Sequence, residues 1–445
     1  MKKYGDYYLS EPPAERAFLV GVTIRGSRPL LTVEESLDEL AQLADTAGMV
    51  VTGNASQTLD HVDPATFIGS GKLQEVKDTI DATGAQVLIF DDELSPRHQR
   101  EIEKRLEEDI KVLDRSALIL DIFAQHARTR EGALQVELAQ YEYRLPRLTR
   151  QWTHLARQAG GGGSRSGNAG VGLRGPGETQ LEVDRREIGR RITKLKSDLD
   201  LVRQHRSRHR QQRTRAGVPV VSLVGYTNAG KSTLLRALTG APVLVANQLF
   251  ATLDPTTRKL EMPSGRQAVI TDTVGFIQKL PTTLIAAFRA TLEEIAESNV
   301  LIHVVDAAHP NVLQHIEAVE DTLAEIEVPS IPKILVWNKI DQTSYDMIEA
   351  LQNSLSNEQD YLAQVTVSAR TGANLDAFTN TIEEALKHDL KRIKLRIPYE
   401  HGDIISMLFD SASIEQQEHT ADGVVLTVQA PPYILSRVEL FEIEG

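Results

Sequence analysis

Residues 218 to 233 limit the possible folds more than any other stretch of the chain. Val218 to Val224 is a short apolar run, long enough for one buried parallel strand. It leads directly into Gly225-Tyr-Thr-Asn-Ala-Gly-Lys-Ser, and the residues from Thr233 to Gly240 favour a helix that ends at the glycine. A strand, a glycine-rich loop and a helix in this order are typical of a phosphate-binding loop. The segment therefore predicts an α/β nucleotide-binding domain.

The residues of this loop suit a polyphosphate. Gly225 and Gly230 let the backbone turn tightly with its N–H groups facing inward, and the positive end of the following helix attracts an anion. We expect Lys231 to reach the β and γ phosphates and the Ser232 hydroxyl to bind Mg²⁺. These residues predict a nucleoside triphosphate as substrate, with Mg²⁺ as the cofactor.

Two later stretches offer groups for the γ phosphate and the metal. The polar loop at 250–257 contains Thr252 and Thr256, and either threonine has the chemistry to complete the Mg²⁺ shell. An apolar run then ends in Asp272-Thr-Val-Gly275, where the carboxylate would orient Mg²⁺ through water and the glycine N–H would meet the γ phosphate. The next residue is Phe276, where many GTPases have a glutamine that orients the attacking water. We therefore expect slow intrinsic hydrolysis that a partner accelerates.

The base is predicted by Asn338-Lys-Ile-Asp341, which follows an apolar run. The Asp341 carboxylate can accept hydrogen bonds from N1 and from the exocyclic amine of guanine, whereas adenine has no proton on N1. Asn338 and the stem of Lys339 would frame the ring, and the Ala369 N–H would donate to the guanine carbonyl oxygen. We therefore expect GTP to bind more tightly than ATP by several orders of magnitude.

The chain of 445 residues, of which 41% are apolar, is long enough for about three domains with ordinary cores. It has no apolar run of the ~20 residues that cross a membrane, and its first residues lack the apolar core of a signal peptide. The absence of cysteine suits a reducing compartment. We therefore expect a cytoplasmic protein, and because no long apolar seam predicts assembly, we expect a monomer.

Alternating helix and strand patterns suggest five parts. We expect a leader at 1–15, a small parallel α/β domain at 16–128, a long antiparallel helical hairpin at 129–215, the P-loop domain at 216–390 and a small α+β domain at 391–445. The hairpin is expected to have helices at 130–158 and 178–213 and a glycine-rich tip at 160–177. Within the second part, Gly69-Ser-Gly-Lys72 suggests a second anion site, but it lacks the full loop, so a plain turn is the better interpretation.

The hairpin carries an uneven share of the charge. The formal charge of −13 argues against nucleic-acid binding over the whole surface, yet residues 185–215 hold twelve Lys or Arg against three acids. The tip contains Arg165 and Arg174, and three aromatic residues lie on the first helix: Tyr141, Tyr143 and Trp152. Cations interleaved with aromatic side chains are typical of contacts with folded RNA. The alternative is a solvated helix face packed on the P-loop domain.

The chain as a whole resembles the HflX family of ribosome-associated GTPases. The resemblance rests on Gly225-Tyr-Thr-Asn-Ala-Gly-Lys-Ser, Phe250-Ala-Thr-Leu-Asp, Asp272-Thr-Val-Gly-Phe, Asn338-Lys-Ile-Asp, and the hairpin segments Gly160-Gly-Gly-Gly and Gly175-Pro-Gly-Glu-Thr-Gln-Leu-Glu. The nucleotide motifs alone would indicate only a GTPase, whereas their combination with the hairpin is specific. The resemblance covers nearly the whole chain and implies that Thr252, rather than Thr256, is the Mg²⁺ ligand.

The resemblance also implies a role on the ribosome. The chain would bind the large ribosomal subunit through rRNA contacts along 141–215, with the N-terminal domain and hairpin tip directed to the peptidyl transferase region. GTP hydrolysis, stimulated by the ribosome, would split or rescue stalled or stressed ribosomes. Two alternatives are a tRNA-modification GTPase, which normally needs a cysteine that this chain lacks, and a regulatory switch for a protein partner.

The expected site residues fall into three groups. Those expected to act in catalysis are Lys231, Thr252 and Gly275. Those expected to hold Mg²⁺ are Ser232 and Thr252, with Asp272 acting through water. Those expected to bind GTP or GDP are Gly225, Tyr226, Thr227, Asn228, Ala229, Gly230, Lys231, Ser232, Thr233, Phe250, Ala251, Thr252, Leu253, Asp254, Asp272, Thr273, Val274, Gly275, Asn338, Lys339, Asp341, Ser368, Ala369 and Arg370.

Overall fold

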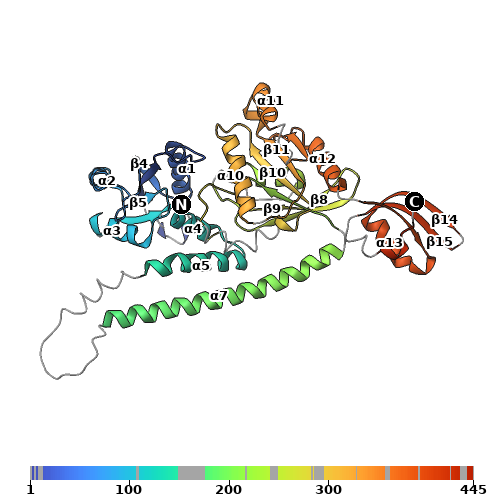
Figure 1. Cartoon of the computed structure of the whole chain (residues 1–445), viewed down its shortest axis with the longest axis horizontal. Coiled ribbons are helices and arrows are strands. Elements are labelled where there is room, and N and C mark those ends of the chain that lie inside the picture. Colours follow the sequence, from blue (N-terminus) through green and yellow to red (C-terminus); the bar gives the residue numbers. More distant parts are fainter. Residues whose placement is uncertain are drawn as a thin grey trace, which may run out of the picture. The chain divides into compact units, whose positions relative to one another are not determined.

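The computed structural model describes residues 3–4, 7–8, 14–106, 110–148, 176–215, 218–240, 249–281, 284, 295–326, 328–355, 361–388, 391–420, 422–430 and 438–443. The chain divides into two compact units, of which the first holds residues 1–199, 248–250 and 278–288 and the second holds the remainder (Figure 1). No helix in the described ranges is both long enough and apolar enough to cross a membrane. The division into five parts by residue number stays a prediction.

The first unit contains a parallel four-stranded sheet in the order β4-β3-β5-β6, as the alternating pattern predicts. Its elements are β1 (Lys3–Tyr4), β2 (Tyr7–Tyr8), β3 (Arg16–Ile24), α1 (Val33–Thr46), β4 (Val50–Leu59), α2 (Ser70–Thr83), β5 (Val87–Phe90), α3 (Pro96–Leu106), β6 (Lys111–Asp114) and α4 (Arg115–His126). Local sequence sets the helix starts, because Thr32 and Glu35 form a capping box at α1 and the Asp114 side chain caps α4.

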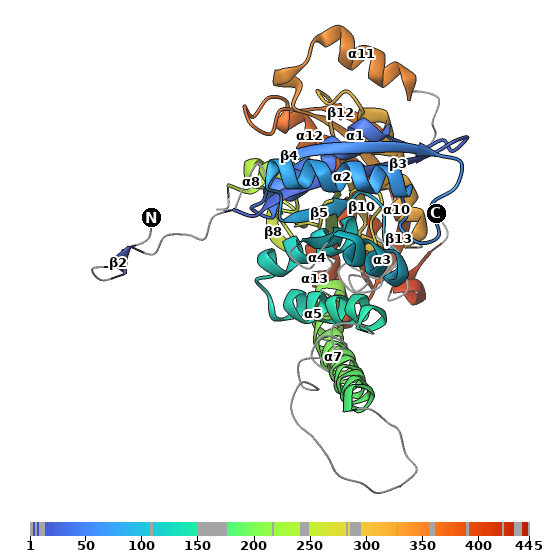
Figure 2. The same cartoon turned by 90° about the vertical axis from the view of Figure 1, so that its left-hand side faces the viewer.

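Helices cover the four-stranded sheet (Figure 2). Side chains that alternate along β3 and β5, such as Phe18 and Phe90, pack with Val76 of α2 and Ile102 of α3 into one hydrophobic cluster. On α1, Leu37, Leu40 and Leu43 are buried, and this helix contacts β3, β4 and α4. The sheet is therefore the middle layer of an α/β fold.

A helical hairpin follows the sheet and is formed by α5 (Arg130–Arg144), the 3-10 turn η1 (Leu145–Arg147) and α7 (Pro176–Arg215) (Figure 1). Leu138 packs against Leu195 and Leu199, and ion pairs join Arg191 to Glu137 at 2.6 Å and Lys196 to Glu142 at 2.9 Å. The first helix was expected to continue to residue 158, but its regular α-helix ends at Arg144, because Pro146 has no N–H to donate. Trp152, Arg165, Arg174 and most of the expected tip lie outside the described residues.

The second unit contains a six-stranded sheet in the order β12-β11-β10-β7-β9-β8, in which only β8 runs antiparallel to its neighbour. Its elements are β7 (Val220–Val224), α8 (Lys231–Thr239), β8 (Thr256–Glu261), β9 (Gln267–Asp272), β10 (Val300–Asp306), α10 (Val312–Glu325), β11 (Lys333–Asn338), η2 (Ile340–Gln342), α11 (Tyr345–Ser354), β12 (Ala363–Thr366) and α12 (Leu375–His388). The carboxyl ends of the parallel strands share one edge, which is where open α/β sheets bind ligands.

The C-terminal part of this unit has a separate antiparallel sheet in the order β13-β15-β14. Its elements are β13 (Lys391–Ile397), η3 (Tyr399–His401), α13 (Gly402–Ser411), β14 (Ser413–Thr420), β15 (Gly423–Ala430) and η4 (Glu439–Phe441). Leu395, Leu408 and Leu426 are fully buried together in its core. The expected α+β fold class of this part is confirmed.

Candidate nucleotide site

The loop between β7 and α8 needs glycine at two positions. Gly225 has φ of +148°, and a Cβ there would lie 2.2 Å from the carbonyl oxygen of Val304. Gly230 has φ of +96°, and a Cβ there would lie 2.3 Å from Nδ2 of Asn338. Among the described residues no side chain caps α8, whose first N–H groups have no acceptor within the helix. The loop and helix start therefore have the geometry of an anion cradle.

Lys231 is buried beneath this loop. Its Nζ donates to the carbonyl oxygens of Gly225 at 2.9 Å and Tyr226 at 2.8 Å. Burial lowers the pKa of Lys231 to about 8, while the nearby carboxylate of Asp272 acts in the opposite direction. An ammonium in such surroundings gains a strong partner when it meets a phosphate.

Three oxygen-bearing side chains meet beside Lys231. The Ser232 hydroxyl donates to Oδ2 of Asp272 at 2.6 Å and lies 2.7 Å from the hydroxyl of Thr252. Oδ1 of Asp272 is buried and has no hydrogen-bond partner in the described part of the chain. Burial raises the pKa of Asp272, whereas Lys231 and Ser232 oppose that rise. Two hydroxyls and a carboxylate are hard oxygen donors, so this group of residues fits Mg²⁺.

The two candidate threonines lie in different places. Thr252 contacts Ser232, whereas Thr256 begins β8 and its hydroxyl reaches only the carbonyl oxygen of Asp254, at 3.5 Å. The geometry thus favours Thr252 as the metal ligand, a choice that residue spacing left open and that the family resemblance implied.

Gly275 lies against the phosphate-binding loop. A Cβ at this position would lie 2.9 Å from Cα of Thr227 and 3.1 Å from Nζ of Lys231. The Phe276 N–H donates to the carbonyl oxygen of Gly225 at 3.1 Å, and the Thr227 N–H donates to that of Phe276 at 2.8 Å. The Thr227 N–H is therefore already paired with the protein backbone. The Phe276 ring is buried, with 2% exposure.

The residues expected to bind the base gather at the ends of β11 and β12. Asn338 donates from Nδ2 to the carbonyl oxygen of Ala229 at 2.8 Å, which ties the base-binding segment to the phosphate-binding loop. Asp341 accepts a hydrogen bond from the Ser368 hydroxyl at 2.6 Å, and this bond is the main reason that its pKa is lowered. Asp341 is therefore an ionised acceptor, as recognition of guanine requires.

Some expected contacts differ. The Ala369 N–H donates to Oδ1 of Asn338 at 3.0 Å, and its expected bond to guanine stays a prediction. The Thr273 hydroxyl donates to the carbonyl oxygen of Leu223 at 2.7 Å, so it secures the strand. Phe250 belongs to the first unit and packs edge-on against Phe123, with 4.6 Å between ring centroids. Burial of the Phe250 ring against Phe123 is energetically more favourable than its exposure to a polar ligand.

Sequence reasoning missed two supporting residues. Asp306 ends β10 and holds Nζ of Lys339 at 2.7 Å, while Lys339 itself has a positive φ of 63°. His315 stacks on the ring of Tyr226 in the phosphate-binding loop, with 3.8 Å between centroids and 4° between planes. An acid at a strand end was a usable signal for Asp306, whereas nothing in the local sequence of α10 links His315 to Tyr226.

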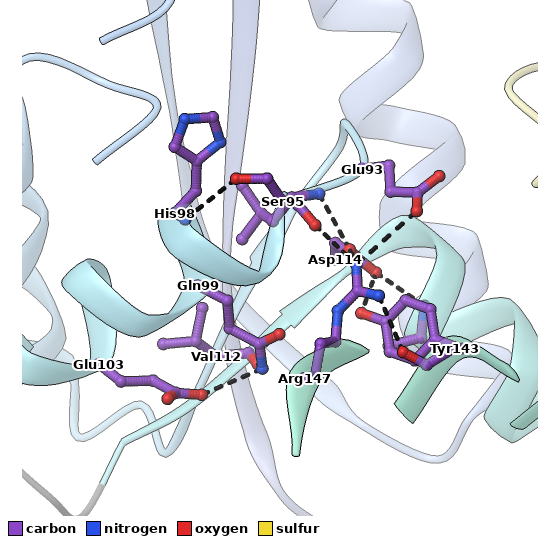
Figure 3. Close-up of polar contacts among 11 residues, drawn as sticks. Glu93, Ser95, His98, Gln99, Glu103, Val112, Asp114, Tyr143 and Arg147 are labelled. Atoms are coloured by element: carbon purple, nitrogen blue, oxygen red, sulfur yellow. Dashed lines mark hydrogen bonds and ion pairs between the residues drawn. The ribbon is translucent and has the colours of Figure 1, made fainter. Parts of the chain in front are cut away.

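The root of the hairpin is a second polar cluster, shown in Figure 3. The Arg147 guanidinium lies 3.6 Å from the ring centroid of Tyr143 and donates to the carbonyl oxygen of Leu94 at 2.6 Å. The Tyr143 hydroxyl donates to Asp114 at 2.8 Å, and the Leu94 N–H donates to the same carboxylate at 3.0 Å. Figure 3 also draws Glu93, 3.7 Å from Arg147. These contacts fix the end of the first hairpin helix to the ends of β5 and β6.

The possible second anion site at Gly69-Ser-Gly-Lys72 differs from the phosphate-binding loop between β7 and α8. Lys72 pairs with Glu75 at 3.0 Å, and no side chain caps α2. Its ammonium pairs within its own helix, and because α2 begins at Ser70, the segment is the first turn of a helix and not the plain turn that the sequence favoured.

Comparisons with known proteins identify sequence relatives over most of the chain. Residues 34–124 match the family described as GTP-binding GTPase N-terminal, 126–213 the GTP-binding GTPase middle region and 220–339 the 50S ribosome-binding GTPase. The chain is 44% identical over 423 residues to the GTPase HflX of Escherichia coli (strain K12), covering 94% of each. It is 44% identical over 410 residues to the GTPase HflX of Alkalihalophilus pseudofirmus, covering 92% of each. A solved structure, that of SsGBP with GDP, has 26% identity and a TM-score of 0.46 and covers 84% of this chain and 99% of its own.

Proposed function

The chain belongs to the HflX family of GTPases, and from this membership we propose that it binds the large ribosomal subunit and splits or rescues stalled or stressed ribosomes. GTP hydrolysis drives the cycle and is stimulated by the ribosome. The N-terminal domain and the hairpin along 141–215 contact rRNA. Support for the RNA contact comes from exposed cations on α7, among them Arg185, Arg190 and Lys194.

The proposed roles at the nucleotide follow from the geometry of the second unit. Lys231 and the start of α8 hold the phosphates, Gly275 meets the γ phosphate, and Asp341 selects guanine. Ser232 and Thr252 would bind Mg²⁺, with Asp272 orienting it through water. The ion would supply positive charge to the phosphates, while the protein side chains position the substrate.

The buried Phe276 carries the proposal that hydrolysis needs stimulation. Its ring is 2% exposed and its backbone is bonded to the phosphate-binding loop on both sides, so it offers no group to orient water. This site brings Lys231 together with the residues proposed to bind Mg²⁺, but it has no glutamine at position 276 to orient the attacking water. It should therefore hydrolyse GTP slowly in the absence of a partner. A ribosomal surface that orders the residues around Thr252 and Gly275 would raise the rate.

The test compares GTP hydrolysis by the purified chain alone and with purified large subunits. The intact chain is measured beside a variant in which residues 160–177 are replaced by a short linker, and GDP affinity is measured for both as a control for the nucleotide site. We expect strong stimulation by large subunits only in the intact chain. Absence of stimulation in the intact chain, with GDP affinity preserved, would contradict the ribosomal role and leave a GTPase with another partner. Sedimentation with ribosomes that RNase abolishes would argue against a protein partner.

A further inference from the structure

Two short segments that adjoin nucleotide-site residues along the chain belong to the first unit. Residues 248–250 end two positions before Thr252, and residues 278–288 begin three positions after Gly275, although Thr252 and Gly275 lie in the second unit. An extended chain reaches at most about 3.6 Å per residue, so such short connections leave little slack. Whatever fixes these two segments therefore limits the positions that Thr252 and Gly275 can take.

Phe250 fixes the segment before Thr252. Its ring is 2% exposed and packs edge-on against Phe123 of α4, with 4.6 Å between ring centroids. The backbone of Phe250 has φ of +57°, a left-handed conformation that bulky residues rarely adopt. Such a conformation persists where the surrounding contacts determine it, and it is a reason to look for a function.

Lys279 fixes the segment after Gly275, and its φ of +53° is also left-handed. Its Nζ donates to Oδ2 of Asp91 at 2.5 Å and to Oδ1 of Asp92 at 2.6 Å. Asp91 is buried in the first unit and also accepts a hydrogen bond from Arg115 at 2.8 Å. Burial would raise the pKa of Asp91, but Arg115 and Lys279 keep it below its usual value. Removing one partner of a buried ionic cluster is unfavourable, so Lys279 is held firmly.

These two anchors, Phe250 and Lys279, coincide with an assembled nucleotide site. In the same structure the Thr252 hydroxyl lies 2.7 Å from that of Ser232. We assign Thr252 to Mg²⁺ and Gly275 to the γ phosphate, a group that GDP does not have. The anchors should therefore matter for the binding of GTP and much less for that of GDP.

We propose that Phe250 and Lys279 are positioning residues through which the N-terminal domain favours GTP over GDP. The inference rests on the roles proposed for Thr252 and Gly275. Segments that are already held lose less conformational freedom when the γ phosphate binds, so GTP binds more tightly. By linkage, GTP strengthens the two anchors by the same factor. The N-terminal domain thus has a route by which a bound partner can change the nucleotide site.

The test uses the full chain without ribosomes and measures, with Mg²⁺ present, the Kd for GDP and for GMPPNP, an analogue that resists hydrolysis. Lys279→Met keeps the stem and removes the charge, and Phe123→Leu removes the ring contact from a residue outside the nucleotide site. Lys104→Met and Phe18→Leu are the matched controls. Lys104 pairs with Glu101 on the surface of α3, and Phe18 is a buried phenylalanine elsewhere in the first unit.

We expect Lys279→Met and Phe123→Leu each to weaken GMPPNP binding by about threefold to tenfold, with the Kd for GDP within about twofold of the parent. Lys279→Arg should behave like the parent, because a guanidinium also pairs with carboxylates. Both controls should keep the parent ratio of the two Kd values. Phe18→Leu also removes a buried ring, so a merely structural effect would appear in it as well.

Thr252→Ala separates this inference from the proposed function. We expect it to weaken GMPPNP binding at least threefold relative to GDP, by about the factor that loss of a metal ligand implies. A changed ratio in Thr252→Ala with unchanged ratios in Lys279→Met and Phe123→Leu would overturn the anchoring role alone. An unchanged ratio in Thr252→Ala would overturn the role proposed for that threonine, and this inference with it.

Discussion

At the scale of single residues, Glu320 shows how neighbouring donors outweigh burial. Burial alone would raise its pKa, but hydrogen bonds from His303, Lys333 and Tyr361 lower it to about 2. The Tyr361 hydroxyl donates to Oε1 at 2.8 Å and Nζ of Lys333 to Oε2 at 2.5 Å. Since His303 belongs to β10 and Lys333 to β11, the carboxylate joins α10 to two strands of the sheet.

This environment predicts a dependence of stability on pH. A carboxyl whose folded-state pKa is depressed stabilises the fold above its unfolded pKa, near 4.5, and this contribution is lost as pH falls towards 2. Between pH 7 and pH 3 the intact chain should lose about 2 kcal/mol more unfolding free energy than Glu320→Gln. Urea unfolding of the second unit, followed by the fluorescence of buried Trp337, measures this difference. Parallel losses in the two proteins would refute the assignment.

At the scale of elements, the root of the hairpin depends on Arg147. Its two terminal nitrogens bond the carbonyl oxygens of Tyr143 and Leu94, at 2.9 and 2.6 Å, and its plane covers the Tyr143 ring. Burial and the Asp114 carboxylate raise the pKa of that tyrosine, so its hydroxyl stays a donor. One side chain therefore links η1, α5 and the loop after β5.

Arg147→Ala should loosen this root. The loss of two hydrogen bonds and a cation–π contact should lower the free energy of local opening by about 2 to 3 kcal/mol. Hydrogen exchange of the amides at 141–147 should accelerate accordingly, by about thirtyfold or more. Arg147→Lys should recover little, because a lysine cannot bond both carbonyls while stacking. Exposed Arg144 supplies the control, and equal exchange in Arg144→Ala and Arg147→Ala would contradict this role.

At the scale of the whole molecule, the chain is acidic overall, whereas its helix α7 is basic. The net charge is −13, while residues 185–215 hold twelve of the 49 basic residues against three acids. On α7, Arg191 and Lys196 pair with acids of α5, but Arg185, Arg190 and Lys194 are exposed on the same helix. Cations that neutralise RNA phosphates release counterions, so they give binding a strong salt dependence.

Replacing Arg185, Arg190 and Lys194 together with glutamine should therefore weaken binding to large ribosomal subunits. The slope of log Kd against log salt should fall by about 2 to 3, close to one for each lost phosphate contact. Glutamine at three exposed cations outside the N-terminal domain and the hairpin, Lys259, Lys394 and Arg396, is the matched control and should change the slope little. An unchanged slope in the first variant would mean that these three cations of α7 are merely solvated.

Local patterns were sufficient for much of the fold. The apolar alternation around Phe18 and Phe90, the capping box at Thr32 and the glycines of the phosphate-binding loop each depend on nearest neighbours along the chain. Such signals involve residues that are close together in the chain, so they can be recognised from the sequence alone. The charged periodicity predicts a first hairpin helix that runs to residue 158, but its regular α-helix ends at Arg144. Pro146 was the local signal for this end, because proline has no N–H to donate to the helix.

The sequence by itself determined the phosphate-binding loop, the Asn338-Lys-Ile-Asp341 motif and the family, because each depends on residue types at fixed spacing. Only the tertiary structure decided that Thr252 and not Thr256 meets Ser232, that Phe250 packs against Phe123, and that the Thr227 N–H pairs with the carbonyl oxygen of Phe276. These outcomes depend on packing between segments far apart in the chain, where burial and pairing of polar atoms choose among positions that sequence spacing leaves equal.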